Sequence, residues 1–504
     1  MIVRQTDTKT ILALLLGLLA LLPLLLGCRA TIQEYPIPPS RDGRAYSLST
    51  DTVNLDTLPS MLLSSTYSLR LFNPGTSPLE LSSIRLKGED SRGFRLNVDG
   101  RAGGAEGLII EGRDSIFIFV RAYLPEGLSD SPTSVMDSIV VTEASGRVSY
   151  IPIVAVRQNV QHLSDLIVRS HETLSSTRPI LIKDSIYIAP GASLTLTPGT
   201  RLLMASSAHI RVEGELLAEG MPQERISLGS IRRDQFLPRV PYSRVPGQWG
   251  GIVVGKAGSI KARHMELTNA KWGIYFVEES EAAPKERLEL RHCRLHNISG
   301  VGISASRGLY VIEDCELSNT LGSTLSLWGG DYTIRRSSII NHYPWPGIRS
   351  SAALSFSNAP RGSTTSERGS RLLVERSVVD GSLGVSASRA SGGEVNITTF
   401  GSQEGSPTVR LVDSYLRMRH YDSPHIEASG IVYAERQGEA NPTYTRLGLD
   451  SLGRKDYLFD FRPTPRAPFV GLIRTGEPDL PPDLSGKARL VPASYGAYEP
   501  ADNS

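Results

Sequence analysis

The amino-acid sequence predicts an all-β protein in which a β-sandwich is followed by a right-handed parallel β-helix. Short runs of alternating apolar and polar residues recur along the chain, and its second half repeats about every 22 residues. The composition agrees, with 47 glycines and 32 prolines among 504 residues and an ordinary hydrophobic fraction of 40%. A chain of this length exceeds one ordinary core, so we expect separate domains or stacked repeats.

The charges are nearly balanced. Lysine and arginine number 54 and aspartate and glutamate 52, which leaves a formal net charge of +2. The two signs are interspersed along the chain and form no basic block. We therefore expect no nucleic-acid partner.

Residues 1–27 are predicted to be a lipoprotein signal peptide. Arg4 and Lys9 precede an apolar stretch that ends in Leu25-Leu26-Gly27-Cys28. This ending is typical of a lipobox, in which the small glycine admits the peptidase and the thiol of Cys28 receives the diacylglycerol. A transmembrane helix is disfavoured because the apolar run is shorter than about 20 residues and contains Pro23.

A lipid anchor on Cys28 makes a membrane the first expected partner, because buried acyl methylenes hold the chain at a bilayer surface. Residues 28–44 are polar and contain several prolines, which suits an extended tether. The sequence leaves open whether the anchored protein faces the periplasm or the cell surface.

Residues 45–160 are predicted to form the β-sandwich. Alternating runs at Tyr67–Phe72, Phe94–Val98 and Ser115–Val120 are separated by turn residues such as Asn73-Pro74-Gly75. This order of strands and turns resembles the Hydin-like immunoglobulin-type modules of bacterial envelope proteins. The resemblance implies an Ig-like β-sandwich that serves as a spacer or binding platform and has no catalytic residues to carry over.

Residues 178–465 are predicted to form the β-helix. Rows such as Leu290-Arg291-His292-Cys293-Arg294-Leu295-His296-Asn297 recur, and Asn297 follows Asn269 by 28 residues. Asn319 and Asn341 follow at further intervals of 22 residues. Equivalent residues would then lie one above another, with apolar columns and a small column facing inward. We expect Asn269, Asn297, Asn319 and Asn341 to form an asparagine ladder, in which each amide bonds to the next and to turn backbone groups.

Two further segments carry a family resemblance. Leu194-Thr195-Leu196-Thr197-Pro198-Gly199-Thr200 and Pro246-Gly247-Gln248-Trp249-Gly250 resemble parts of right-handed β-helix lipoproteins of Gram-negative anaerobes. The resemblance implies a lipid-anchored protein of the outer membrane, in a fold shared with pectate lyases and adhesins. Residues 466–504 are expected to be a C-terminal tail that packs on the last coils.

Several residues are candidates for chemistry. Cys293 and Cys315 are expected to be stacked buried thiols, with a disulfide left open. The spacing of His292 and His296 suits a metal only on a helix, so we expect no metal and no cofactor. The columns that contain Arg291-Glu313-Arg335 and His292-Asp314-Arg336 are expected to form a surface charge ladder.

No catalytic residue is assigned. Asp314, Asp380 and Asp413 lie in different columns or distant coils, whereas glycosidase and lyase sites need clustered carboxylates. The insertion from His342 to Ser350 holds Tyr343 and Trp345 between prolines and is a candidate binding loop. The alternative is that Trp345 folds back onto the coil. Trp249 and Trp272 are expected to pack.

We therefore expect a non-catalytic envelope lipoprotein that binds a glycan or another envelope protein on the flank and loops of the β-helix. The alternative function is a polysaccharide lyase or glycoside hydrolase that acts on the same flank, with Asp314 or Asp413 as the residues to test.

Overall fold

The computed structural model describes residues 40–88, 93–237, 240–277, 286–385, 392–401, 408–420, 422–435, 443–473 and 480–501. Over these residues the chain is all-β, with one short 3-10 turn, η2 (Tyr242–Arg244), and no α-helix. No helix within the described ranges is long and apolar enough to cross a membrane. Cys28, the predicted lipidation site, and the predicted signal peptide lie outside the described residues.

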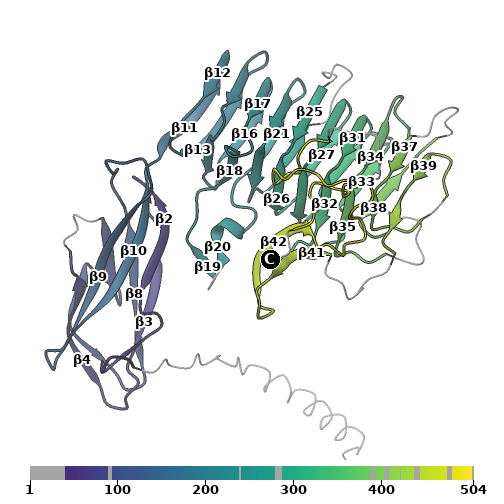
Figure 1. Cartoon of the computed structure of the whole chain (residues 1–504). Helices are drawn as coiled ribbons and strands as arrows, with labels where there is room; N and C mark the ends of the chain where they lie inside the picture. Colours follow the sequence, from purple (N-terminus) through teal and green to yellow (C-terminus); the bar gives the residue numbers. More distant parts are fainter. Residues whose placement is uncertain are drawn as a thin grey trace, which may run out of the picture.

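The N-terminal part consists of two five-stranded sheets (Figure 1). Their strands pair antiparallel except for β2 and β10, which run parallel. Leu69, Ile118, Ile139 and Ile153 are fully buried in the one core that the sheets share. The first sheet contains β1 (Ser47–Leu48), β3 (Tyr67–Phe72), β8 (Ser115–Ala122), β5 (Phe94–Val98) and β6 (Arg101–Ala102), and the second β2 (Val53–Pro59), β10 (Val148–Gln158), β9 (Thr133–Glu143), β4 (Leu79–Leu86) and β7 (Gly104–Ile110).

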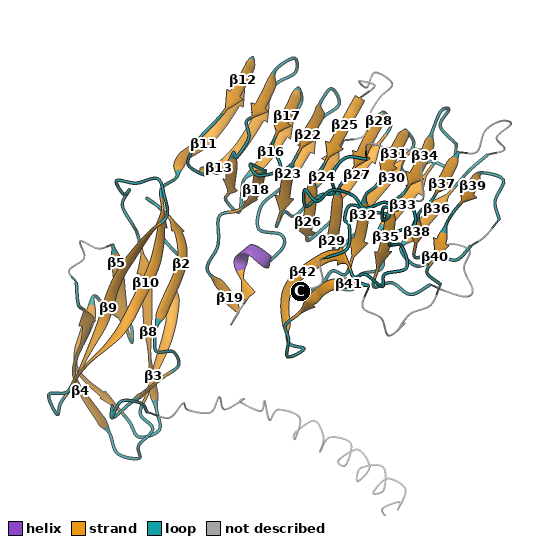
Figure 2. Ribbon diagram, in the orientation of Figure 1, coloured by secondary structure: helices purple, strands orange, loops and turns teal. Residues whose placement is uncertain are grey.

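Two long parallel sheets follow, as predicted, and their strands lie side by side in Figure 2. The ten-stranded sheet contains β12 (His171–Leu174), β14 (Ser193–Leu196), β17 (Glu215–Glu219), β22 (Ser259–Arg263), β25 (Glu286–Arg291), β28 (Leu309–Glu313), β31 (Asp331–Arg335), β34 (Arg371–Glu375), β37 (Val409–Val412) and β39 (Ile426–Ser429).

The other parallel sheet has 18 strands. They are β11 (Gln161–Val168), β13 (Ile180–Ile188), β15 (Arg201–Met204), β16 (His209–Val212), β18 (Ile226–Ser230), β21 (Ile252–Val254), β23 (Met265–Thr268), β24 (Ile274–Phe276), β26 (Arg294–Ile298), β27 (Ile303–Ser306), β29 (Glu316–Thr320), β30 (Leu325–Trp328), β32 (Ser338–Asn341), β33 (Leu354–Ser357), β35 (Val378–Gly381), β36 (Val395–Thr398), β38 (Tyr415–Leu416) and β40 (Val432–Tyr433).

The strand register places like residues above like, as the repeat predicts. Leu290 pairs with Ile312, and Ile312 pairs with Ile334 in the next strand. All three are buried in one continuous core. Because each lap of the chain adds the same apolar side chains to the same columns, the core is a stack in which each layer covers the one before.

The turns that join the strands use left-handed backbone at matching positions. His292, Asp314 and Arg336 have φ values of 52°, 53° and 45°, and Asn269 and Asn297 have values of 64° and 62°. Asparagine and aspartate tolerate this conformation because their short polar side chains bond locally. The shape of the turn therefore favours asparagine at Asn269, Asn297 and Asn319, whereas Asn341 does not have left-handed backbone.

The bonds of these asparagines differ from the predicted ladder. Asn269 Nδ2 donates to the carbonyls of Ser243 and Val245, and Asn341 Nδ2 donates to the Thr320 carbonyl at 2.9 Å. Within the described ranges no hydrogen bond joins one of the four amides to another. The strand register places the four side chains in one column, but backbone carbonyls at the corners are their nearer partners.

A ladder does form, in the small inward-facing column. The backbone N–H of Cys315 donates to Ser337 Oγ at 3.1 Å, that of Ser337 to Ser377 Oγ at 3.2 Å, and that of Ser377 to Ser414 Oγ at 3.1 Å. Each serine hydroxyl in turn donates to a backbone carbonyl two residues before it. These side chains thus satisfy buried corner groups, besides being small enough to fit.

Removing one member of this serine ladder should destabilise the stack. In Ser337→Ala the buried N–H of Cys315 loses its partner, whereas the Arg335 carbonyl keeps the N–H of Asp314 at 3.1 Å, so we expect the free energy of unfolding to fall by about 1–3 kcal/mol. Urea denaturation measures this change. Ser207→Ala is the matched control, because the Ser207 hydroxyl also donates to a carbonyl, at 3.0 Å from Lys183, but is exposed. Equal losses in the two variants would contradict the ladder.

The parallel stack begins and ends at other residues than predicted. It starts at β11, which pairs in parallel with β13, so the first strand precedes residue 178. It ends at β40, and residues 444–463 form the antiparallel hairpin of β41 (Tyr444–Leu449) and β42 (Lys455–Pro463) instead of a further coil. A second hairpin, β19 (Gln235–Leu237) with β20 (Val240–Pro241), leaves the stack earlier.

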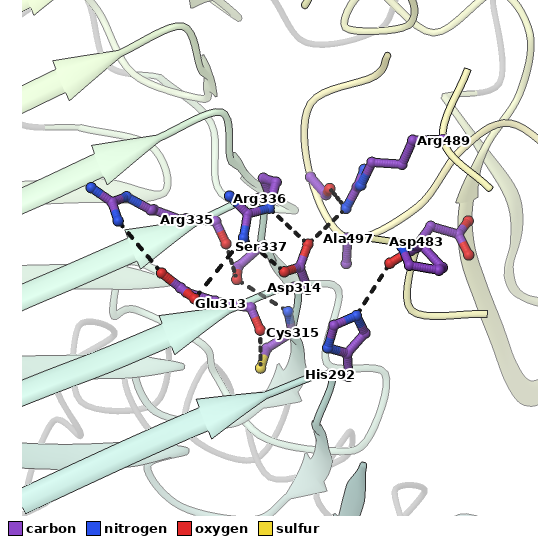
Figure 3. Close-up of polar contacts among 12 residues, drawn as sticks. His292, Glu313, Asp314, Cys315, Arg335, Arg336, Ser337, Asp483, Arg489 and Ala497 are labelled. Carbon is purple, nitrogen blue, oxygen red and sulfur yellow. Dashed lines mark hydrogen bonds and ion pairs between the residues drawn. The ribbon is translucent and has the colours of Figure 1, made fainter. Parts of the chain in front are cut away.

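The C-terminal segment also departs from the prediction. Its first part contacts late coils, where Phe469 packs against Tyr415. It then runs back along the stack to earlier coils, where Arg489 pairs with Asp314 (Figure 3). Ala497 N donates to Ser338 Oγ, and the Leu484 carbonyl accepts from Arg225. The expectation that residues 466–504 pack on the last coils is therefore wrong for most of the segment.

Candidate functional site

An open groove of about 790 Å³ lies between the outer face of the 18-stranded sheet and the hairpin β41–β42. Its floor is formed by β23, β26 and β29, and the opposite wall by the hairpin. Figure 1 shows this hairpin beside the stack, far in sequence from the strands that it faces. The lining residues include Glu266, Arg294, His296, Asn297, Glu316, Asn319, Arg446, Tyr457, Phe459 and Arg462.

The floor carries a column of alternating charge, Glu266, Arg294 and Glu316, placed by the strand register. His296 Nε2 donates to Glu266 at 3.0 Å. This bond lowers the pKa of Glu266 to about 2, and although burial opposes it, the same contact raises the pKa of His296 above its usual value. Glu266 is therefore ionised throughout the physiological range.

Glu316 is held from two sides. Ser318 Oγ donates to it at 2.7 Å, and the hydroxyl of Tyr498 from the C-terminal segment donates to its other oxygen. Burial lowers the pKa of Arg294, but Tyr498, Glu316 and Glu266 raise it more, so this guanidinium stays charged. The floor is a preorganised set of ions whose partners lie within the protein.

The hairpin wall is fixed to the stack by polar contacts. Arg446 pairs with Asp456 within the hairpin, and Arg244 from η2 donates to the Asp456 carbonyl at 2.6 Å. At the base of the hairpin, the hydroxyl of Tyr444 donates to Asp380 at 2.7 Å, and Arg417 pairs with the same carboxylate. The wall is thus attached at both ends of the groove.

Trp345, the predicted binding residue, folds back instead of standing at a loop tip. Its ring stacks on Tyr457 at 4.1 Å and 15°, and its Nε1 donates to the Arg244 carbonyl at 3.1 Å. Tyr343 is half-buried, and burial raises its pKa to about 12. Neither aromatic ring stands free at the loop tip, where Ile348 is 95% exposed. The Trp345 ring packs against Tyr457, and Tyr457 lines the groove. The backbone of Tyr457 is left-handed, with a φ of 60°.

Two of the predicted asparagines line the groove with part of their amide unused. Asn297 Nδ2 donates to the Arg244 carbonyl, and Asn319 Oδ1 accepts from the His342 N–H at 3.0 Å. Among the residues that the structure describes, Asn297 Oδ1 and Asn319 Nδ2 have no hydrogen-bond partner, and neither atom is buried without solvent contact. The two residues are only 8% and 5% exposed, so one acceptor and one donor reach the groove through a small part of each amide.

The carboxylates named for catalysis lie elsewhere. Asp314 is bound by Arg336 at 2.9 Å and by Arg489 at 3.0 Å, with only 3% of its side chain exposed (Figure 3). Asp380 is 1% exposed, and Asp413 lies in the turn that precedes Ser414. The structure does not bring Asp314 and Asp413 together in the groove, and the tail removes Asp314 from the surface that the sequence analysis gave it.

The first charge column is a surface ladder, as expected. Arg291 pairs with Glu313, and Arg335 contacts both Glu313 at 3.6 Å and Glu375 at 2.8 Å. The arginines are 38% and 41% exposed, but Glu313 between them is only 9% exposed, so the ladder lies at the surface through its arginines while its central carboxylate is buried.

The cysteines and histidines have intramolecular partners. Cys293 and Cys315 are free and buried, and burial raises the pKa of the Cys315 thiol well above its usual value. His292 Nε2 donates to the Pro482 carbonyl at 3.2 Å, and its ring lies 4.9 Å from that of His264. In the described ranges no group of three or more His, Cys, Asp or Glu side chains is placed to hold a metal ion.

Sequence reasoning missed the hairpin and the floor carboxylates. Glu266, Arg294 and Glu316 occupy the position directly after the small column in successive rows, so alternation alone assigns them to the outer face. The alternation is visible in the sequence, but it does not distinguish this column from the other columns of outward-facing residues. The hairpin covers this column of side chains. The contacts that close the groove join residues more than 100 positions apart in the sequence.

Comparisons with known proteins give no family. No protein-family model matches this chain, and no curated protein matches it. Solved structures show low similarity: a family 123 glycoside hydrolase from Clostridium perfringens (10% identity, TM-score 0.17, 24% of this chain and 26% of that one), a protein of unknown function from Porphyromonas gingivalis W83 (11%, 0.18, 26% and 60%) and a family 28 exopolygalacturonase from Yersinia enterocolitica (11%, 0.15, 72% and 97%).

This chain thus spans about a quarter of the Clostridium enzyme and 60% of the Porphyromonas protein. Scores this low carry no argument about function. The fold and the groove define an all-β protein of long parallel sheets with an open polar groove on one flank.

Proposed function

We propose that this protein is a non-catalytic, lipid-anchored envelope protein that binds a glycan in the groove between β23, β26, β29 and the hairpin β41–β42. The observation that carries the proposal is the open amide atoms of Asn297 and Asn319 beside the ring of Tyr457. Sugars present both hydroxyl groups, which pair with fixed donors and acceptors, and apolar ring faces, which pack on aromatic side chains.

The charged floor favours binding over catalysis. A general acid at neutral pH needs a raised pKa, whereas the pKa of Glu266 is lowered to about 2. Glu316 is already bonded by Ser318 and Tyr498. Both carboxylates therefore act as fixed hydrogen-bond acceptors in the floor of the groove.

The cellular location of the protein is part of the same proposal. The lipobox at Cys28 supports a lipid anchor, with residues 28–44 as a tether and the outer membrane as its place. The two N-terminal sheets and the strand-turn order support an Ig-like spacer, and the two parallel sheets support a right-handed parallel β-helix. An envelope protein is the other partner that the groove could accept.

One observation favours a second function, a polysaccharide lyase or glycoside hydrolase. Glu266 and Glu316 share a column with one strand between them, which sets their backbones about 10 Å apart. Inverting glycosidases hold their two carboxyl groups about 6.5–9.5 Å apart. If the groove is catalytic, Glu266→Gln should abolish cleavage, and Asp314→Asn should not.

Asn319→Asp tests the binding proposal. The change keeps the acceptor for the His342 N–H and replaces the donor by an acceptor, so we expect glycan binding to weaken about tenfold or more, with some loss of stability because the new carboxylate is only slightly exposed. Isothermal titration calorimetry against a panel of neutral and acidic oligosaccharides measures the affinity, and thermal melting the stability.

The matched control is Asn97→Asp on the N-terminal sheets, where Oδ1 likewise accepts one backbone N–H, that of Gly100 at 3.0 Å. It should leave binding unchanged. Binding that survives Asn319→Asp, or the absence of binding to every member of the panel, would reject the groove as a glycan site.

A further inference from the structure

A second pocket, of about 410 Å³, lies where the N-terminal sheets meet the parallel stack. Residues of β2 and β10 line one side of it, and residues of β15 and β20 line the other. Figure 1 shows β2 at the edge of the N-terminal sheets that faces the hairpin β19–β20. The pocket shares one lining residue, Ser243, with the groove. Ligand pockets form preferentially at such junctions between domains.

The two parts of the chain are held together around this pocket. Ser65 Oγ donates to Asp234 Oδ2 at 2.6 Å, and Arg178 pairs with Asp130 at 2.7 Å. An apolar cluster at the same junction consists of the buried residues Val160, Leu181 and Leu203, with Leu62 and Ile231 packed against them. The pocket is therefore built before a ligand arrives, so that little ordering cost opposes binding.

Two arginines of the pocket are nearly without partners. Arg233 is exposed, and among the residues that the structure describes it forms no hydrogen bond and no ion pair. Its neighbour in sequence, Arg232, instead pairs with Asp234 at 2.6 Å. Arg201 donates a single bond of 3.4 Å to the Thr177 carbonyl. Because a guanidinium has five N–H donors, most of the bonding capacity of Arg201 and Arg233 is unused.

A β-bulge in β2 sets the position of the one acidic side chain of the pocket, Asp56. Leu55 and Asp56 lie opposite the single residue Ala155 of β10, and Asp56 has a left-handed φ of 57°. Bulges re-aim side chains and recur beside functional sites. Asp56 Oδ1 accepts the Thr57 N–H at 2.7 Å, whereas its Oδ2 has no hydrogen-bond partner in the described part of the chain. One oxygen of this carboxylate is therefore available to a ligand.

The three charges influence one another, although within the described ranges no ion pair joins them. Partial burial lowers the pKa of Arg233 from its usual value. The carboxylates of Asp56 and Glu266 oppose this shift, and the charge of Arg201 adds to it. The other lining residues carry no charge. The pocket thus holds two positive groups and one negative group, each with bonding capacity left for a ligand.

We propose that this junction pocket binds a small aminoalkyl phosphate monoester. Arg201 and Arg233 receive the phosphate, which has three acceptor oxygens and about two negative charges near neutral pH. Asp56 receives the ammonium group of the ligand. The charges of such a ligand complement those of the pocket one for one. The site does not depend on the groove, and it stands if the groove binds nothing.

Isothermal titration calorimetry on the purified protein tests this site with O-phosphoethanolamine and with ethyl phosphate, which carries the same phosphate without an ammonium group. O-phosphoethanolamine should bind about tenfold more tightly, because only its ammonium pairs with Asp56. Arg233→Gln should weaken both probes about tenfold or more, since each loses a charge-assisted contact. Asp56→Asn should remove the difference between the two probes.

Arg101→Gln and Asp99→Asn are the matched controls on the N-terminal sheets. Arg101 is exposed and donates one bond to a carbonyl, that of Glu106 at 3.2 Å, and Asp99 has a left-handed φ of 48°. Both variants should keep the affinities of the parent protein. Equal binding of the two probes, no binding of either, or unchanged affinities in Arg233→Gln would overturn the proposal.

A third probe separates a free phosphate ester from a lipid headgroup. Glycerophosphoethanolamine has the same ammonium group, but its phosphate is a diester with one negative charge, so it should bind more weakly than O-phosphoethanolamine. Tighter binding of the diester would assign the pocket to a phospholipid headgroup and overturn the monoester. Asn319→Asp changes the groove and not this pocket, so it should leave all three affinities unchanged whether or not the groove binds a glycan.

Discussion

Glu394→Ala should lower the free energy of unfolding by about 3–5 kcal/mol, the largest effect that we expect from a single substitution. The Glu394 side chain is fully buried and pairs with Arg349, which is 6% exposed. Its two oxygens also accept the backbone N–H groups of Ala353 at 3.0 Å and Leu383 at 2.8 Å. Alanine would leave the buried Arg349 cation without its carboxylate, although it keeps bonds to Asn341, Ser351 and Ser382, and would leave the N–H groups of Ala353 and Leu383 without their partner.

Denaturant unfolding of Glu394→Ala should be compared with Glu427→Ala. Glu427 also pairs with an arginine, Arg410, at 3.1 Å, but both side chains are about half exposed. An exposed pair contributes about 0–1 kcal/mol, so this control should unfold almost like the parent protein. Similar losses in the two variants would show that the burial of Glu394 is not what makes it important.

Asp314→Ala should have an effect of similar size, about 3–5 kcal/mol. The Asp314 carboxylate compensates two guanidiniums, Arg336 from the next coil and Arg489 from the C-terminal segment, which is 1% exposed (Figure 3). Removing it should also loosen the segment, because Arg489 would lose its closest acidic partner. Urea denaturation and limited proteolysis of the C-terminal segment measure the two effects.

Asp331→Ala is the matched control for Asp314→Ala. Asp331 pairs with Arg371 of the adjacent strand through two bonds of 2.8 and 2.7 Å, but Arg371 is 69% exposed. We expect a loss below about 1 kcal/mol. A stable Asp314→Ala variant with a protected C-terminal segment would contradict the role of Asp314 as the residue that holds the segment on the stack.

The parallel stack was predictable because burial imposes it on every lap. Leu290, Ile312 and Ile334 must face inward at equal intervals, so their spacing appears in the sequence. The serine ladder was only half predictable. Ser337, Ser377 and Ser414 were recognised as small, but their second role depends on which corner N–H groups lack a strand partner, and that follows only from the backbone path.

The groove could not be predicted, because its wall comes from far along the chain. Nothing near Glu316 indicates that Tyr498 will bond it, and nothing near Trp345 indicates that Tyr457 will cover its ring. For the same reason Asp314 was assigned to the surface, where it would lie without Arg489. Trp249 is buried as expected, whereas Trp272 is exposed because no later segment of the described chain covers it.

The length of a bound glycan after incubation tests the central claim most directly. Purified protein is incubated with a glycan that it binds, and the recovered chains are measured by mass spectrometry. A non-catalytic binding protein returns chains of unchanged length at every time point. Shortened chains that no longer form with Glu266→Gln would contradict the account and establish the groove as an active site.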